Sequence, residues 1–326
     1  MLLPIAALLA GLLMLAWSGE QFVQGARALA RHGRMPPLLV GLVVVGFGHS
    51  VPELAVAIWS AWLERPGLAL GNAWGAHIVN IGLILAVTAL LAPVRLRSQV
   101  LRREAPMLLA ATALTAVLVA DSTLSRADAF VLLAAMGALL VWTVRQPRRH
   151  ADDALAREIA ADDAPAPTRS LGAALLQSLV AAAVLAGGSA LLVWGTAAAA
   201  WLLGISDLAM GLSVIALGCA LPELAACVAA ARQGDDDVVL GTVLGAALFN
   251  LLAVVGLTAA IAPADIEPQA LTRDLPVLAG MTLALFVLAR RRGEGLLRRP
   301  EALTLLFAYG AYLAWLLATL VPGGGT

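Results

Sequence analysis

Long apolar runs, separated by short polar segments, recur along almost the whole chain. A run of about 20 apolar residues can cross the hydrocarbon core of a bilayer as an α-helix. The pattern therefore predicts an all-α membrane protein with ten transmembrane helices. We place these helices at about residues 2–26, 37–62, 68–92, 105–120, 125–145, 171–201, 207–231, 238–262, 274–291 and 301–321.

The two halves of the chain carry the same apolar pattern. GHSVPELAVAI begins at Gly48 and GCALPELAACV begins at Gly218. A second matching pair follows, with GNAWGAHIVNIGLIL from Gly71 and GTVLGAALFNLLAVV from Gly241, and every matched position is offset by 170 residues. The chain therefore divides into three predicted parts, which are a first transmembrane repeat at 1–145, a linker at 146–170 and a second transmembrane repeat at 171–326.

Charge placement predicts how the helices insert. Five helices per repeat is an odd number, so the two repeats enter the membrane with opposite orientation, as a five-plus-five inverted repeat. With the N-terminus outside, 18 of the 21 arginines fall in inner segments, and only Arg65, Arg126 and Arg273 fall outside. Because positive charge accumulates on the cytoplasmic side, this predicts a multi-pass protein of a bacterial inner (plasma) membrane with both termini outside. The 146–170 linker is then cytoplasmic.

Composition excludes several classes of function. Hydrophobic residues make up 61% of the chain, charged residues only 13%, and the mean hydropathy is +0.91. These values are far from those of soluble enzymes, and the net charge of zero gives no support for nucleic-acid binding. We therefore expect inorganic cations and the lipid bilayer as partners, no cofactor beyond the transported ions, and no enzymatic activity. The oligomeric state is left open.

A glutamate follows a proline in the middle of an apolar run of each repeat. These pairs are Pro52 with Glu53, and Pro222 with Glu223. A carboxylate at membrane depth costs at least about 2–3 kcal/mol, so it indicates function by default. Two carboxylates at matched places in an inverted repeat predict a cation site at the interface between the repeats.

The prolines also free two carbonyl groups for ion binding. Proline has no N–H to donate to the carbonyl four residues earlier in a helix. The carbonyls of Gly48 and Gly218 therefore lack their helical donor, and in a membrane they need another partner. A cation bound in a cavity is one partner that suits them.

Helical spacing gathers further polar side chains near the glutamates. His49, Ser50 and Glu53 share one face, and His77 and Asn80 share a face of the following helix. The matched positions of the second repeat are Cys219, Ala220, Glu223, Ala247 and Asn250. Carboxylates, amide oxygens and free carbonyls form a set of hard oxygen ligands of the kind that Ca²⁺ prefers.

This duplicated pattern resembles the alpha repeats of the sodium/calcium exchanger family, within the cation/calcium antiporter superfamily. Each repeat carries G-x-S/A-x-P-E followed by G-N/T-x-x-G-x-x-x-x-N, and the likeness extends over nearly the whole chain. The resemblance implies that Glu53 and Glu223 bind Ca²⁺, that Asn80 and Asn250 lie at the central site, and that Ser50 helps to bind Na⁺. It implies a secondary active antiporter that exchanges Ca²⁺ for Na⁺ by alternating access.

The chain also departs from the family pattern. His49 and Cys219 stand where the family has threonine. Alanine replaces serine at three of the four paired serine positions, which are Ala76, Ala220 and Ala246. Several simultaneous Na⁺ ions would therefore lack hydroxyl ligands, which leaves the counter-ion open between Na⁺ and H⁺.

Three interpretations of these departures follow. His49, one turn from Glu53, can titrate near neutral pH and carry protons in place of Na⁺. Alternatively, His49, His77 and Cys219 join the glutamates in a nitrogen, sulfur and oxygen set, which suits Mn²⁺ or Zn²⁺ better than Ca²⁺. The third interpretation is a relative that binds a cation but does not transport it.

Overall fold

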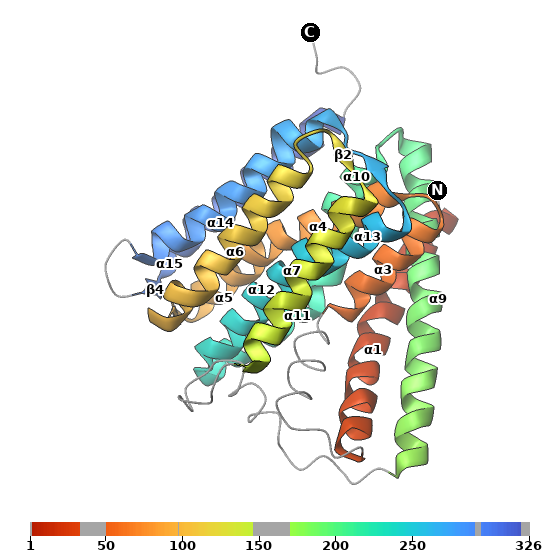
Figure 1. The fold of residues 1–326 in the computed structure, drawn as a ribbon, viewed down its shortest axis with the longest axis horizontal. Helices are drawn as coiled ribbons and strands as arrows, with labels where there is room; N and C mark the ends of the chain where they lie inside the picture. Colours follow the sequence, from red (N-terminus) through yellow and green to blue (C-terminus); the bar gives the residue numbers. More distant parts are fainter. Residues whose placement is uncertain (1, 33–49, 97, 146–169, 291–294, 321–326) are drawn as a thin grey trace.

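The computed structural model describes residues 2–32, 50–96, 98–145, 170–290 and 295–320, which form a bundle of helices (Figure 1). The first repeat comprises α1 (Leu2–His32), α3 (Val51–Trp62), α4 (Pro66–Val79), η2 (Asn80–Leu85), α5 (Ala86–Leu91), β1 (Val94–Arg95), α6 (Ser98–Leu118), β2 (Thr123–Leu124) and α7 (Arg126–Arg145). The second repeat comprises α9 (Leu171–Leu203), α10 (Asp207–Met210), η3 (Gly211–Ile215), α11 (Ala216–Gln233), α12 (Asp236–Phe249), η4 (Asn250–Val254), α13 (Val255–Ile261), β3 (Ala264–Asp265), η5 (Ala270–Asp274), α14 (Leu275–Arg290), β4 (Leu296–Leu297) and α15 (Arg299–Leu320). The η segments are π-helical.

The predicted membrane helices are confirmed in the described residues. Eight apolar helical segments there are long enough to cross a bilayer, and two shorter apolar helices, Val51–Trp62 and Glu104–Leu118, match the remaining predicted spans. Several spans consist of consecutive helical elements, as in α4, η2 and α5. The first part of the span predicted at 37–62 and almost all of the 146–170 linker lie outside the described residues.

Two short antiparallel sheets connect the repeats in a symmetric way. Strand β1 of the first repeat pairs with β4 of the second, and β3 of the second pairs with β2 of the first. An additional backbone hydrogen bond extends each sheet, from Leu96 to Gly295 and from Ile266 to Ser122. Both acceptor residues have positive φ, +60° at Gly295 and +66° at Ser122. Each repeat thus contributes one strand to each sheet, as expected for an inverted repeat.

Helices α1 and α9 pack along each other at one side of the molecule (Figure 1). Glycines allow this close approach, because a Cβ atom on Gly11 would lie 2.6 Å from the Leu192 backbone nitrogen. One on Gly195 would lie 2.7 Å from the Pro4 carbonyl oxygen. Small residues at such contacts are typical of membrane helices, where close van der Waals packing drives association.

Helix α4 packs just as closely on the second repeat. A Cβ atom on Gly71 would meet the Leu208 carbonyl oxygen and lie 2.9 Å from the Gly211 Cα. One on Gly75 would lie 2.7 Å from the Ala216 Cβ. These contacts hold α4, which is followed directly by Asn80, against η3 and α11, so they help to determine how the two repeats meet.

The glycine contacts generate a matched pair of predictions, since Gly75 and Gly245 occupy the same motif position. Gly75→Ala should destabilise the protein by about 1–3 kcal/mol, because the new methyl group overpacks against the Ala216 side chain of α11 and the Leu212 backbone of η3. Gly245→Ala should be neutral or stabilise by up to about 1 kcal/mol, because nothing lies within 4 Å of its Cβ position and alanine favours a helix. Thermal unfolding in detergent measures both, and equal effects would contradict the packing described.

Candidate functional site

The two glutamates and the two asparagines of the predicted site lie in the interior of the bundle. Their exposed fractions are 2% for Glu53, 4% for Glu223, and 1% for both Asn80 and Asn250. Glu53 is on α3 and Glu223 on α11, while the asparagines are the first residues of η2 and η4. Segment η2 contacts α11, and η4 contacts α3. Each asparagine-bearing segment therefore packs against the glutamate-bearing helix of the other repeat.

A hydrogen bond joins the two repeats at this point. With its amide oriented according to its hydrogen-bond partners, Asn80 donates to Glu223 Oε2 over 3.1 Å and to the Ala76 carbonyl oxygen over 3.2 Å. The negative charge of Glu223 also interacts electrostatically with that of Glu53. The structure therefore brings Glu53, Glu223 and Asn80 together, as the sequence predicts.

Several buried polar atoms of these residues have no hydrogen-bond partner among the described residues. These atoms are Glu53 Oε2, Glu223 Oε1, Ser50 Oγ and both amide atoms of Asn250. A buried polar group without a partner costs about 1–3 kcal/mol, and more when it is charged. Most of these atoms are oxygens, which are the ligands that a hard cation such as Ca²⁺ takes. The donor set thus fits a bound cation.

The proline positions differ between the repeats. Helix α3 begins at Val51, so Pro52 lies in its first turn, whereas Pro222 lies inside α11. Because Pro222 has no N–H, the Gly218 carbonyl lacks its usual helical donor. Helix α1 covers both places, since a Cβ atom on Gly19 would lie 3.1 Å from Pro52 Cγ and one on Gly218 would meet the Leu12 side chain. Gly48 and His49 lie outside the described residues.

His77 contacts α14. Its Nε2 lies 2.7 Å from the hydroxyl oxygen of Thr282, which donates its own proton to the Leu278 carbonyl oxygen. With the hydroxyl proton directed at Leu278, the Thr282 oxygen accepts from Nε2 in the tautomer that carries its proton there. Thr282 is a partner that the sequence analysis missed. Its helical position relative to His77 could not be read from spacing, since 205 residues separate them.

Cys219 is buried and interacts electrostatically with both Glu53 and Glu223. In the described part of the chain, however, no three His, Cys, Asp or Glu side chains group closely enough to hold a metal ion. The described residues therefore do not assemble the nitrogen, sulfur and oxygen set that includes His77. A site made of two carboxylates, completed by amide and main-chain oxygens, needs no third side chain of these types.

The three alanines that replace serines are also buried. Ala76, Ala220 and Ala246 are 2%, 3% and 4% exposed. They lie on α4, α11 and α12, the helices that approach the glutamates and asparagines. This part of the interior therefore offers a small cation fewer side-chain oxygens than the family pattern does.

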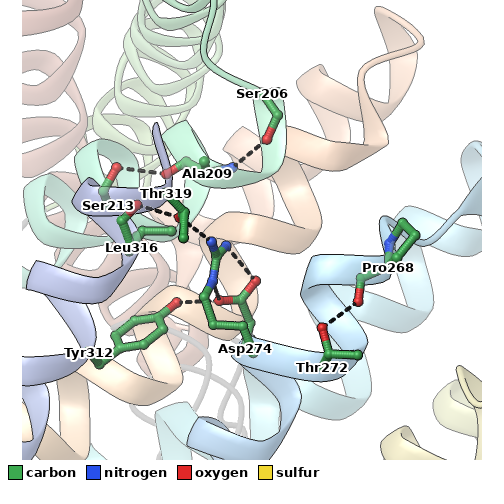
Figure 2. Close-up of polar contacts among 10 residues, drawn as sticks. Ser206, Ala209, Ser213, Pro268, Thr272, Asp274, Tyr312, Leu316 and Thr319 are labelled. Atoms are coloured by element: carbon green, nitrogen blue, oxygen red, sulfur yellow. Dashed lines mark hydrogen bonds and ion pairs between the residues drawn. The ribbon is translucent and has the colours of Figure 1, made fainter. Parts of the chain in front are cut away.

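A second buried polar cluster lies between the end of η5 and α15 (Figure 2). Arg273 forms an ion pair with Asp274, with 2.7 Å between Nε and Oδ1, and the residues are 4% and 0% exposed. From α15, Tyr312 donates to Asp274 over 2.9 Å, and Thr319 accepts from Arg273 over 2.6 Å. The first repeat carries an Arg103-Glu104 pair at the positions that match Arg273 and Asp274, and this repetition could have pointed to the cluster from the sequence. Because every charge has a partner, the cluster serves to hold η5 against α15.

Comparisons with known proteins agree with this arrangement. The chain is 39% identical over 315 residues to the putative antiporter CaxA of Alkalimonas amylolytica, covering 96% of this chain and 98% of that protein. It is 36% identical to the inner membrane protein YrbG of Escherichia coli (strain K12), covering 97% and 96%. Solved structures of the sodium-calcium exchanger NCX_Mj match with a TM-score of 0.63 and 25% identity, covering 96% of this chain and 98% of that one.

The model of the sodium/calcium exchanger protein family matches residues 3–145 and 173–318, which include nearly all of both repeats. This family consists of ion transporters. The chain is therefore a multi-pass membrane protein that belongs to the sodium/calcium exchanger family.

Proposed function

We propose that the protein is a secondary active antiporter that moves Ca²⁺ across the membrane in exchange for Na⁺ or H⁺. The supporting observation is the meeting of Glu53 and Glu223, one from each repeat, with unpartnered buried oxygens. Two carboxylates balance the charge of one divalent cation. The name of the sodium-calcium exchanger NCX_Mj supports the same function, as does that of the sodium/calcium exchanger MaX1 of Methanosarcina acetivorans, which is 36% identical over 97 residues, or 30% of this chain.

The cation would bind between the repeats. Ca²⁺ takes six to eight oxygen ligands at about 2.3–2.6 Å. Glu53 and Glu223 would supply charged oxygens, Asn250 an amide oxygen, and Ser50 a hydroxyl. The Gly218 carbonyl, left without a helical donor, would add a main-chain oxygen. The sequence predicts that the Gly48 carbonyl would add another. Asn80 would hold Glu223 in place through its amide nitrogen.

Exchange requires that the counter-ion and Ca²⁺ compete for this one site. When Ca²⁺ leaves, two neighbouring buried negative charges repel each other strongly because little water screens them. Protons or Na⁺ would relieve that repulsion and allow the empty transporter to reorient. The inverted repeat supplies two related half-pathways to the site, one from each side, so alternating access follows from exchanging the conformations of the two repeats.

One observation favours a second candidate substrate. Cys219 lies near both glutamates, and a thiolate ligand would favour a softer divalent ion such as Zn²⁺, or an intermediate one such as Mn²⁺, over Ca²⁺. Against this, no three His, Cys, Asp or Glu side chains in the described part of the chain group closely enough to hold a metal ion. We therefore keep Ca²⁺ as the proposed substrate. A relative that binds cations without transporting them would show binding but no flux in the experiments below.

The first functional prediction concerns the carboxylates. Glu53→Gln and Glu223→Gln should each reduce Ca²⁺ flux into proteoliposomes by at least about tenfold, since loss of one charged ligand costs about 1.5–3 kcal/mol. Thermal stability without Ca²⁺ should stay equal or rise, because each change removes a buried charge. The exposed Glu20 provides a matched control, and Glu20→Gln should transport at the wild-type rate. Wild-type flux in either site variant would contradict a shared site.

The second concerns the counter-ion. Ca²⁺ flux should respond more steeply to a pH gradient than to a Na⁺ gradient, because Ala76, Ala220 and Ala246 leave part of the cost of dehydrating Na⁺ uncompensated. Restoring hydroxyls with Ala76→Ser and Ala220→Ser should increase the Na⁺ response. His49→Thr should flatten the pH response if His49 carries the proton, a role that rests on the sequence alone. Flux driven only by Na⁺, at a rate independent of pH, would contradict this proposal.

The third concerns orientation. We propose that both termini lie outside and the 146–170 linker lies in the cytoplasm, as the arginine distribution indicates. Cells expressing Thr326→Cys should react with a membrane-impermeant thiol reagent, whereas Ala160→Cys should react only after permeabilisation. The native Cys219 and Cys227 are buried, so the unmodified protein serves as the blank. Labelling of Ala160→Cys in intact cells would reverse the proposed orientation.

A further inference from the structure

A cavity of about 400 Å³ lies between the C-terminal part of α9 and the turn that joins α3 to α4. Its wall on α9 includes Trp194, Ala197, Ala198 and Trp201, and its wall on the turn includes Arg65. None of these residues belongs to the candidate cation site. The volume lies within the range of about 300–1,000 Å³ that is typical of small-ligand pockets.

Arg65 supplies the polar feature of this cavity. It forms an ion pair with Asp207 on α10, in which a single guanidinium nitrogen, Nη1, reaches both carboxylate oxygens at 3.2 Å. Within the described residues, Nε and Nη2 of Arg65 have no hydrogen-bond partner, and 42% of the side chain is exposed. The unpaired edge of a guanidinium suits a phosphate group, which accepts two N–H bonds in parallel.

The tryptophans indicate where the cavity lies relative to the membrane. Trp194 and Trp201 are seven residues apart, so they lie on the same side of α9, and they are 47% and 79% exposed. Trp201 is close to Gly204, which ends the helix. Helix α9 has 33 residues and is about 50 Å long, which exceeds the hydrocarbon core of about 30 Å. Exposed tryptophans near such a helix end are typical of the boundary between lipid and water.

We propose that this cavity binds one phospholipid of the surrounding membrane. The headgroup phosphate lies against Nε and Nη2 of Arg65, and the first part of one acyl chain runs along Trp194, Ala197 and Ala198. The remainder of the lipid stays in the bilayer. The bound lipid bridges α9 and the turn between α3 and α4.

Local charge selects the headgroup. Asp207 already balances Arg65, and the exposed Glu64 adds a negative charge next to it in the sequence. A headgroup with a net negative charge would therefore be repelled, while a zwitterionic one places its phosphate on Arg65 and its positive group near Asp207. An ammonium can donate hydrogen bonds to a carboxylate, whereas a trimethylammonium cannot. The cavity therefore fits phosphatidylethanolamine better than phosphatidylglycerol or phosphatidylcholine.

Native mass spectrometry of the full-length protein tests this site. Purified protein is stripped of lipid and then exposed to phosphatidylethanolamine, phosphatidylglycerol or phosphatidylcholine in separate experiments. The wild type should retain one phosphatidylethanolamine. Arg65→Gln should lower retention by about tenfold, the loss expected from charged hydrogen bonds to one phosphate. Ala198→Trp, which fills the cavity but keeps Arg65, should lower it to a similar extent.

Asp207→Asn is the matched control for Arg65→Gln, because each change breaks the same ion pair but only Arg65→Gln removes the phosphate donor. Asp207→Asn should retain lipid and should shift its preference toward phosphatidylglycerol. The proposal is overturned if the wild type retains no lipid, or if Asp207→Asn loses lipid as Arg65→Gln does. It is also overturned if inorganic phosphate displaces the lipid, which would indicate an anion site only. Cation flux is not a readout here, so failure of this site leaves the proposed transport function unaffected.

Discussion

Two carboxylates that share a buried site repel each other unless a bound cation or a proton neutralises the charge. Glu53 and Glu223 come from opposite repeats and interact electrostatically in the interior of the bundle. In surroundings with little water, the repulsion is far stronger than it would be at the surface. Their unpartnered oxygens add a further cost that a bound cation would remove. A requirement for positive charge is therefore built into the interface between the repeats, and the proposed exchange of ions rests on it.

The inverted repeat is what brings these two groups together. Segment η2 of the first repeat packs on the helix of Glu223, and η4 of the second packs on the helix of Glu53. The close contacts of the α4 glycines with the second repeat, and the two strand pairs that join the repeats, stabilise the same arrangement. The π-helical segments η2 and η4 begin at the matched asparagines, and such widened turns are frequent at functional sites.

Helix positions and the meeting of Glu53, Glu223 and Asn80 could be predicted from the sequence, because apolar runs set the spans and the 170-residue offset pairs the motifs. Other features depend on contacts between distant segments and leave no local pattern. The hydrogen bond from His77 to Thr282 and the strand pairs between the repeats are of this kind. The sequence also failed to predict the burial of Arg273, because positive charge near a helix end usually indicates an exposed loop. In the structure, the adjacent Asp274 and the distant Thr319 compensate for its burial.

The central claim is that one divalent cation binds between Glu53 and Glu223. Anomalous scattering from crystals grown with Sr²⁺, an oxygen-seeking substitute for Ca²⁺, measures the position of the ion directly. We predict a single strong peak within coordination distance of both carboxylates, at about 2.3–2.7 Å, slightly longer than for Ca²⁺. A peak that contacts only one glutamate, or a strong peak elsewhere with none between the two carboxylates, would contradict the shared site.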